Sequence, residues 1–293
     1  MPGFSSLDDL LLETSTNGKF DVVNWARTVN TGATSAAGRW HECFASTGSG
    51  GIGSLSGTAG VGAAFTAASS GALPIGAANV TPDLRYLASL QAYTPAATLV
   101  PGRILLVDLL YQYPSCVVTG TPTTLNNTAP RPTRLGTGAG VRVGAAVNGA
   151  LGAATPLLTL SYTNQAGTSG RSGTLQASAA SLPVGTLLSP GATAGIQGGP
   201  AMNLAAGDSG VRQIDSYAIT SGGTTGTVTL FLYRPIASLP LVAANTEALT
   251  NLLNDLPPLS QIQDDACLTF LALTGGALVA NQQIAGDLKT VWG

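Results

Sequence analysis

Residues 207–235 contain two strand-like runs separated by a Gly/Ser/Thr-rich connection. In the second run, Val228, Leu230 and Leu232 alternate with threonine and aromatic residues, so one face is aliphatic and the other is aromatic and Thr-rich. Two such runs around a short connection predict a β-hairpin with a longer loop. Because both sides of the second run are apolar, we expect both of its faces to be covered, as in a sandwich with a further layer outside it.

Short apolar runs bounded by Pro, Gly and Asn extend this β pattern through the middle of the sequence. These runs are 104–113 with its continuation 116–118, then 141–147, 157–163, 174–178 and, after the middle region, 267–273. Several short strands with frequent turn signals predict an antiparallel β-sandwich of jelly-roll type.

Helical spacing of apolar residues is found towards both ends. The segment Phe4–Thr14 has Ser5 and Ser6 as candidate N-caps and acidic residues in its first turn, where the helix dipole favours them. Apolar residues at i, i+3, i+4 and i+7 predict a second helix over 22–29. Two more predicted helices are 81–88, for which an extended strand is the alternative, and 246–253 with Thr246 as its cap.

Together these patterns predict a mainly β protein with a jelly-roll-like antiparallel β-sandwich core. Residues 1–99 would form an N-terminal helical or extended arm and a loop-rich segment, 100–240 the sandwich, and 241–293 a C-terminal helix and tail that packs on the sandwich or on a neighbour. We interpret the irregular region 32–78 as loop-rich structure rather than a linker, because its aromatic residues need a core. These residues are Trp40, Phe44 and Phe65.

Composition changes the picture, because only 9% of the residues are charged against about 25% in an ordinary domain. Lys19 and Lys289 are the two lysines, and the net charge is −2. A surface with so little charge associates readily, which predicts a subunit inside an assembly. Arg131 and Arg134 form the best basic cluster of the sequence. Two arginines are too few for a phosphate-binding footprint, so the sequence predicts no nucleic-acid partner. No apolar run reaches the length of a membrane span, and the first residues do not resemble a signal peptide.

The three cysteines are Cys43, Cys116 and Cys267. Three cysteines cannot all pair, and no CxxC motif is present. We expect buried free thiols in a reducing compartment, with a single disulfide and one leftover thiol as the alternative.

The Gly207–Gly210 sequence, Gly-Asp-Ser-Gly, resembles the surroundings of the nucleophile in trypsin-like serine proteases. With His41 upstream, the residues His41, Asp208 and Ser209 could supply a triad, which requires a positioned imidazole base and an acid behind it. Against a protease, His41 lies in Trp-His-Glu-Cys, Val211 follows the motif, and paired disulfides are missing. We therefore expect a tight turn that enters a strand.

Other motifs are equally weak. Gly48, Gly50 and Gly53 match GxGxxG, but no acidic residue follows before Asp83 to bind a ribose. The Asp264–Asp265 pair is interpreted as a solvated cap, and the pair of Asp208 and Asp215 has too few neighbouring ligands for calcium. The sequence therefore predicts no catalytic residue, no cofactor and no metal.

Three blocks resemble virion structural proteins of tailed bacteriophages: Leu160–Gly167, Gly207–Arg212 and Leu232–Ile236. The Ala/Gly/Thr-rich, lysine-poor composition is similar to that of head decoration (cement) proteins. The resemblance implies a non-enzymatic virion subunit, assembled in the host cytoplasm. Its implied partners are sister copies, possibly as a trimer, and the major capsid protein, with neither nucleic acid nor membrane.

Two alternatives remain within the structural and binding classes. The chain could be the major capsid subunit or a tail subunit, although long helices and more charge are typical of shell subunits. A jelly-roll module that binds a glycan or receptor would need exposed side chains at loop tips, and the candidates are Tyr111, Tyr113 and Tyr162.

Overall fold

The computed structural model of the protein describes residues 3–29, 38–75, 79–95, 101–120, 122–190, 199–251, 260–276 and 282–293. Over these residues the fold is mainly β, with three antiparallel sheets and one short α-helix. The elements are α1 (Leu7–Leu11), the π-helical turn η1 (Leu12–Thr16), β1 (Phe20–Val29), β2 (Trp40–Glu42), β3 (Ala63–Ala64), β4 (Arg85–Tyr93), β5 (Pro101–Val117), β6 (Thr123–Thr124), the 3-10 turn η2 (Thr133–Leu135), β7 (Arg142–Gly149), β8 (Leu157–Asn164), β9 (Arg171–Gln176), β10 (Val211–Ser221), β11 (Thr227–Pro240), β12 (Ala248–Asn251), β13 (Gln261–Ile262), β14 (Cys267–Thr274) and β15 (Gln282–Trp292).

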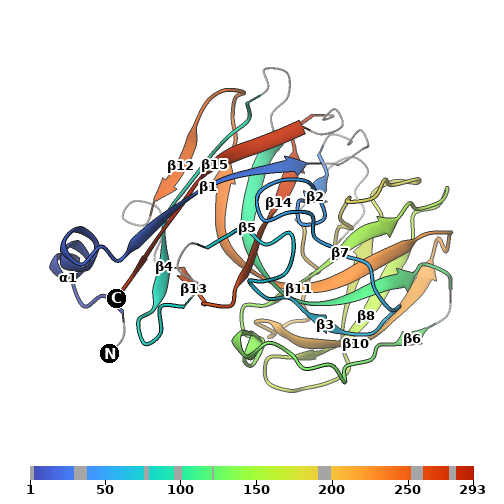
Figure 1. Ribbon diagram of the computed structural model, residues 1–293. Helices are drawn as coiled ribbons and strands as arrows, with labels where there is room; N and C mark the ends of the chain where they lie inside the picture. Colours follow the sequence, from blue (N-terminus) through green and yellow to red (C-terminus); the bar gives the residue numbers. More distant parts are fainter. Residues whose placement is uncertain are drawn as a thin grey trace.

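A central sheet runs in the order β2-β14-β5-β11-β7, with β3 beside β5. Its two longest strands are β5, with 17 residues, and β11, with 14. They pair from Thr227 opposite Val117 to Pro240 opposite Arg103, with three register shifts on the way. Such shifts bend strands and increase their twist. Both strands therefore curve through the whole width of the molecule (Figure 1).

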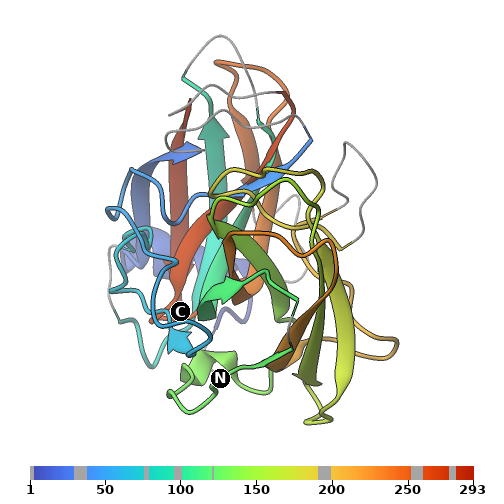
Figure 2. The same cartoon turned by 90° about the vertical axis from the view of Figure 1, so that its right-hand side faces the viewer.

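One end of the central sheet is covered by a side sheet of order β6-β10-β8-β9. The apolar cluster between these sheets takes Leu160 and Tyr162 from β8, Ile214 from β10, and Val228 and Leu230 from β11. The side sheet draws its strands from the middle of the sequence. In Figure 2 its green and yellow strands lie apart from the blue strand β1 and the red strand β15, which belong to a different sheet.

The opposite end of the same face is covered by a terminal sheet of order β1-β15-β4-β12, with β13 beside β4. Its cluster includes Trp25 from β1, Leu90 from β4 and Leu288 from β15, packed on Leu106 of β5 and Phe270 of β14. The rings of Trp25 and Phe270 lie 4.2 Å apart between centroids. The first and last strands of the chain are thus neighbours in one sheet.

The other face of the central sheet is covered by the loop-rich segment that contains β2 and β3. Trp40, Phe44 and Phe65 from this segment pack with Phe231 and Tyr233 of β11 in a third apolar cluster. The prediction that the aromatic residues of this region need a core is confirmed. The alternating residues of β11 therefore reach opposite clusters, and the predicted coverage of both faces is also confirmed.

The predicted hairpin over 207–235 is wrong, although both of its strands exist. Among the described residues, β10 pairs with β6 and β8 in the side sheet, whereas β11 pairs with β5 and β7 in the central sheet. The connection carries Gly222 and Gly226 at positive φ, +65° and +108°. A chain that bends at these glycines crosses from one layer of the sandwich to the other instead of folding back on itself.

Three of the predicted helices are wrong in the described residues. Residues 22–29 lie in β1, 85–88 lie in β4 as the extended alternative predicted, and 248–251 form β12. In β1, Trp25, Arg27 and Val29 face the core, while Val22 lies on the outer face. The apparent helical spacing arose from combining residues of both faces of one strand. Residues 252–253 of the predicted C-terminal helix lie outside the described residues.

The first predicted helix is confirmed in shortened form. Ser6 accepts a hydrogen bond from the backbone N–H of Asp9 at 3.1 Å and acts as the N-cap of α1. The strands expected from 104–118, 141–147, 157–163 and 267–273 are also present, as β5, β7, β8 and β14. The short strand expected at 174–178 is present as β9, shifted toward the N-terminus.

Candidate functional site

The Gly207–Gly210 segment is the tight turn that the sequence predicts, and β10 begins directly after it. The carboxylate of Asp208 accepts hydrogen bonds from the Tyr162 hydroxyl at 2.6 Å, the Asn164 amide at 2.7 Å and Nε of Arg171 at 3.0 Å. Chiefly the Tyr162 hydroxyl, together with Asn164 and Arg171, lowers the pKa of Asp208. The carboxylate therefore fastens this turn to β8 and β9 and is not aimed at Ser209.

His41 lies on β2, between Ala272 of β14 and Thr186. It is fully buried, and neither ring nitrogen has a hydrogen-bond partner in the part of the chain that the structure describes. Burial and, to a smaller degree, Arg39 lower the pKa of His41 to about 4. A general base must reach the proton that it accepts. No hydrogen bond joins His41 to Asp208 in the described residues, so the three candidate residues do not form a triad.

The Gly48–Gly53 motif surrounds a buried arginine instead of a phosphate. Nη1 of Arg27 donates to the carbonyls of Ser46 at 3.1 Å and Gly51 at 2.7 Å, and its Nη2 donates to the carbonyl of Gly71. Gly48 has a φ of +150°, and a Cβ there would collide with the carbonyl of Ala26. The glycines thus allow the loop to approach β1 closely. No helix follows the motif in the described residues, so it lacks the context of a dinucleotide site.

The sequence did not reveal a buried ionic cluster centred on Arg134. Its Nε donates to both carboxylate oxygens of Asp108, at 3.0 and 3.2 Å, and its Nη1 lies 3.0 Å from Oδ2 of Asp265. Its Nη2 donates to the carbonyls of Phe65 at 2.7 Å and Leu109 at 2.8 Å. Burial raises the pKa of Asp108, and the neighbouring guanidinium opposes that shift. Every part of the guanidinium joins separate chain segments, which makes the cluster a structural tie.

Arg131 and Arg134, the best basic cluster of the sequence, do not share one basic surface. Arg134 is buried and neutralised, whereas Arg131 is exposed. The expected solvated cap at Asp264–Asp265 is confirmed only in part, because Asp265 is exposed but both carboxylates also bind other chain segments. Asp264 accepts hydrogen bonds from the N–H of Val80 at 3.1 Å and the hydroxyl of Thr81 at 2.9 Å, and Asp265 binds Arg134. A carboxylate inside the apolar run 104–113 was the signal for a buried cation, but the sequence does not name which arginine.

Among the described residues, no group of three His, Cys, Asp or Glu side chains is placed to hold a metal ion. Asp215 accepts from Thr163 at 2.9 Å and from Gln213, away from the partners of Asp208. The pair that was considered for calcium thus serves two separate hydrogen-bond networks.

The three cysteines are free and buried, as the sequence predicts. Cys116 belongs to the cluster under the side sheet, Cys43 to the cluster under the terminal sheet and Cys267 to the third cluster. Burial raises the pKa of each thiol, that of Cys116 to about 12. Reactive thiols have lowered pKa values and access to solvent, so these three serve as core residues.

The tyrosines proposed for ligand binding at loop tips are not exposed. Tyr111, Tyr113 and Tyr162 are each fully buried. Their hydroxyls are used inside the protein, for example by Tyr113, which donates to Asn127 at 2.6 Å. This prediction of the binding-module alternative is therefore wrong, and the bulk of the aromatic residue supplies core packing.

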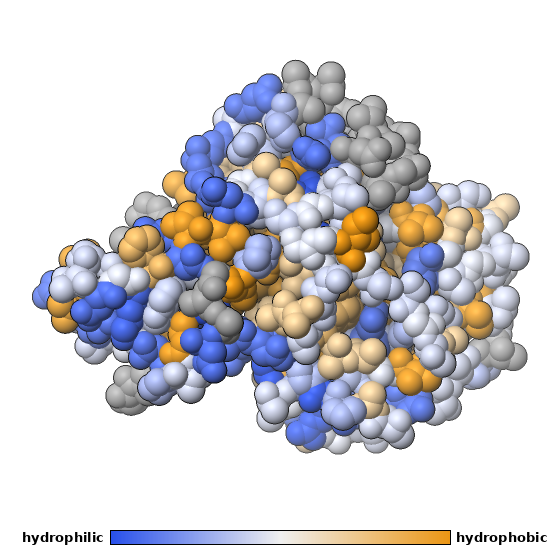
Figure 3. Space-filling model, in the orientation of Figure 1, coloured by the Kyte–Doolittle hydropathy of each residue, from blue (hydrophilic) through white to orange (hydrophobic). Residues whose placement is uncertain are grey.

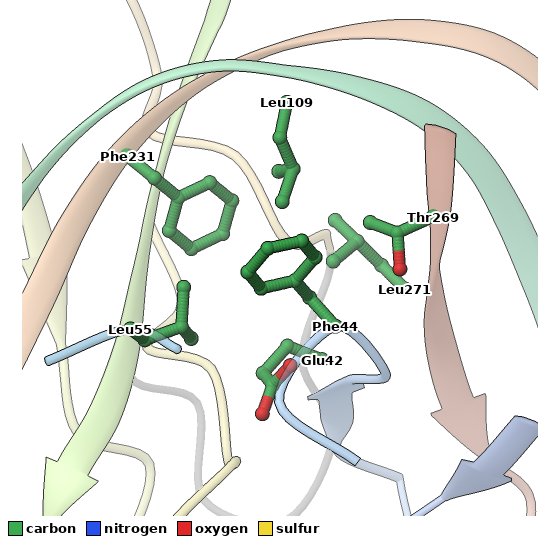
Figure 4. A pocket seen from close by; sticks show the side chains of 7 residues that line it. All are labelled: Glu42, Phe44, Leu55, Leu109, Phe231, Thr269 and Leu271. Atoms are coloured by element: carbon green, nitrogen blue, oxygen red, sulfur yellow. The ribbon is translucent and has the colours of Figure 1, made fainter. Parts of the chain in front are cut away.

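The cavities are small or lack converging chemical groups. A cavity of about 10 Å³ lies inside the third cluster (Figure 4), where the carboxylate of Glu42 points away from the aromatic rings. It is lined by Glu42, Phe44, Leu55, Leu109, Phe231, Thr269 and Leu271. It has room for roughly one water, and an apolar cavity of this kind stays dry.

Glu42 also borders a surface depression of about 130 Å³, together with Ser54, Ser56 and Asn148. Burial raises the pKa of Glu42, and the backbone N–H of Ala45, at 2.8 Å, opposes that shift. The depression is smaller than the roughly 300–1,000 Å³ of ordinary ligand pockets. A wider depression of about 450 Å³ lies beside Arg142, Met202 and Asn203. It gathers no combination of nucleophile, base and acid.

With this geometry in view, comparisons with known protein families, curated proteins and solved structures find no match to the chain. A search of the described helices for one that is long and apolar enough to cross a membrane also finds none.

Proposed function

We propose that this chain is a non-enzymatic structural subunit of a tailed-phage virion, of the head-decoration type. The observation that carries the proposal is the distribution of charge. Of the 26 charged residues in the sequence, five in the described part are buried: Arg27, Glu42, Arg85, Asp108 and Arg134. Further charges pair with each other, as Lys19 does with Glu13 and Asp83. The chain uses part of its small stock of charge internally and leaves little for its surface.

Large apolar side chains also remain exposed on the described surface. Eleven of them in the described residues are more than two-fifths exposed, among them Leu7, Ile52, Val184 and Val242. Figure 3 shows such orange side chains spread over this face between pale, weakly polar ones. Contiguous apolar patches are typical of interaction sites, and Leu7, Leu11 and Leu12 are three exposed leucines within one short segment. Obligate interfaces are large and apolar, as expected for a subunit that is permanently packed against neighbouring subunits.

In this role the protein acts mechanically. Burying apolar surface contributes about 25 cal/mol per Å², less the cost of ordering the partners, and would clamp neighbouring capsomers together. A jelly-roll-like strand order, a homotrimer and contacts with the major capsid protein belong to this proposal, and they rest on the family resemblance. Placement in the shell itself or in the tail is the alternative within the same class.

The fate of the candidate chemical groups supports a role without catalysis. Asp208 fastens a turn, His41 is buried without a partner in the described residues, and the three cysteines lie in apolar clusters. Each of these described groups has a structural task or no access to solvent.

The test is to purify virus particles from cultures of the source organism on a density gradient and to quantify this chain by mass spectrometry across the fractions. We expect it to co-sediment with the particle peak at a fixed ratio to the most abundant shell protein. A matched control is a soluble host enzyme of similar mass, which should stay at the top of the gradient. Recovery of the chain with that control, and not with particles, would refute the virion assignment.

A further inference from the structure

β1 is an edge strand of the terminal sheet, and the protein covers only half of its outer edge. At the covered half, the N–H of Ala26 donates to Ser49 Oγ at 3.0 Å, and the N–H of Thr28 donates to the carbonyl of Thr47 at 2.9 Å. Successive residues of a strand direct their backbone groups to opposite edges, so the even-numbered residues face outward. The backbone N–H and C=O groups of Val22 and Asn24 therefore point away from β15, with no described partner.

The open half of this edge is also apolar. Phe20 and Val22 on the outer face of β1 are 46% and 49% exposed. In the preceding arm, Leu7, Leu11 and Leu12 are 57%, 53% and 51% exposed, and α1 contains no buried residue. The arm lies at the N-terminal end of β1 (Figure 1). The arm itself packs on the far side of this strand, where Phe4 lies 5.8 Å from Tyr86 of β4 between ring centroids. Phe20 and Val22 are therefore the exposed apolar residues beside the unpaired backbone groups.

The other sheet edges in the described residues are shorter than β1, and most are protected. β9 has six residues and is bridged at Gln176 to Ser189, and in β2 the N–H of Glu42 donates to the carbonyl of Gly185 at 2.9 Å. β6 has two residues and β12 four, and short edge strands resist pairing. β7 is covered by the 186–188 segment, because the N–H of Val147 donates to Thr186 at 2.9 Å and that of Leu188 to Ala145 at 2.9 Å. β1, with ten residues, is the longest edge strand, and its open half carries neither a proline nor a bulge. This edge is the one that the fold leaves ready for a further strand.

We propose that the open edge of β1 pairs antiparallel with β1 of a second copy of this chain, which joins two terminal sheets across a two-fold axis. This inference rests on the proposed function, since it names a surface through which sister copies associate, and it replaces the homotrimer of the family resemblance with a two-fold dimer. An open strand edge requires an extended strand as its partner, and a strand that pairs antiparallel with itself forms a closed, isologous contact.

Charge favours a second copy as the occupant. Like charges directly opposite each other destabilise a strand pair, and the outer-face residues of β1 are Phe20, Val22, Asn24, Ala26 and Thr28, all uncharged. Self-pairing therefore brings no like charges together on this face. The exposed side chains of Phe20 and Val22 supply only a small part of the ~800 Å² per partner of a standard interface. The strand edge and the surrounding sheet must supply the rest, so we expect a dimer that dissociates on dilution.

The test compares dimer formation by Val22→Pro, Val22→Lys and the unmodified chain, by sedimentation velocity at concentrations up to about 100 μM. Proline at position 22 removes an outward-pointing N–H and no hydrogen bond to β15, as edge strands tolerate. We expect both variants to weaken dimerisation at least tenfold. Leu249→Lys is the matched control, because Leu249 is 52% exposed on β12 at the opposite edge of the same sheet, and it should dimerise normally.

Circular dichroism checks that each variant is folded, and Val22→Lys decides the question if the proline variant does not fold. A chain that stays monomeric over the whole concentration range overturns the inference. Oligomers that persist unchanged in both Val22 variants, or that are disrupted equally by Leu249→Lys, also overturn it. Neither result depends on whether the chain co-sediments with particles, so failure of this contact and failure of the virion role are distinguishable.

Discussion

The two ends of the central sheet are built in different ways. The side sheet covers one end with β6, β8, β9 and β10, all from the segment between residues 123 and 221. The terminal sheet covers the other end with strands from both extremes of the sequence, so that Phe20 lies opposite Val291. Each end has its own apolar cluster, and β5 and β11 belong to both. One end of the central sheet is thus covered by strands that are close together in the sequence, and the other end by strands that are far apart in the sequence.

The difference shows where a single sequence is informative. The longer strands of the central and side sheets are flanked by Pro, Gly and Asn and have at least one continuous apolar face, which makes them recognisable. The strands β2, β3 and β6, with two or three residues each, were not predicted. Strands of the terminal sheet have one face in water, and their exposed apolar residues, such as Val22 and Leu249, confuse the pattern. The conformation of β1 is then decided by its pairing with β15, more than 250 residues away in the sequence, and not by local preference.

The largest expected effect lies between the two ends, at the ionic cluster. Arg134→Met should lower the free energy of unfolding by about 3–5 kcal/mol, because it leaves the carboxylate of Asp108 buried without its cation. Chemical denaturation measures the change. Adding Asp108→Leu should recover much of the loss, whereas the exposed control Arg131→Met should change stability by less than about 0.5 kcal/mol. A single variant as stable as the unmodified protein would contradict the structural role of the cluster.

A pair of core variants tests whether the two ends are independent. Trp25→Ala removes a ring from the cluster under the terminal sheet and should cost about 3–5 kcal/mol, and Leu160→Ala in the cluster under the side sheet should cost about 2–5 kcal/mol. Hydrogen exchange should accelerate mainly in β1, β4 and β15 for the first variant and in β8 and β10 for the second. Equal acceleration at both ends in each variant would show that they open as one unit.

A smaller effect concerns pH and His41. Burial lowers the pKa of His41 from 6.5 to about 4, so between these values the unfolded chain binds a proton that the folded chain does not. The contribution of His41 to the free energy of unfolding is therefore complete above about pH 6.5. As the pH drops towards 4, the free energy of unfolding falls by up to about 3 kcal/mol from this source. Denaturation midpoints measured across this range, with His41→Phe beside the unmodified chain, isolate the effect.

Two carboxyl groups act in the opposite direction. Burial raises the pKa of Glu42 and Asp108, so their folded forms retain protons that the unfolded chain has lost, and stability from this source falls as the pH rises. Both groups remain in the His41→Phe variant, so they cancel from the comparison. Identical pH profiles for the two proteins would rule out His41 as a source of acid sensitivity.

The smallest effect is confined to the arm. Ser6→Ala removes the N-cap hydrogen bond of α1 and should weaken that helix by about 0.5–2 kcal/mol. Because α1 has no buried residue, global stability should not change, while amide exchange over residues 7–16 should become faster. Ser5→Ala, which removes the exposed hydrogen bond from the Ser5 hydroxyl to Asp9 at 3.1 Å but keeps the N-cap, should have a smaller effect. A drop in the global unfolding midpoint would show that the arm is part of the core.

Particular residues show why other features of the structure could not be predicted from the sequence. The alternation around Leu230 and Phe231 revealed that both faces of β11 are covered. It could not reveal that β10 belongs to another sheet, because a glycine-containing connection suits a hairpin and a crossing between layers equally well. The apolar setting of Asp108 was a signal that the sequence analysis did not use, and Arg134 is 26 residues away, so only the fold selects it. The free thiols were predictable from number and spacing alone.

The pairing of β1 with β15 has a consequence for synthesis. At roughly 5–20 residues per second, β1 leaves the ribosome on the order of ten seconds or more before its neighbour exists. During that delay Trp25 and Val29, both buried in the finished protein, have nothing to lie against. The nascent chain must therefore hold β1 without its neighbouring strand until β15 has been synthesised.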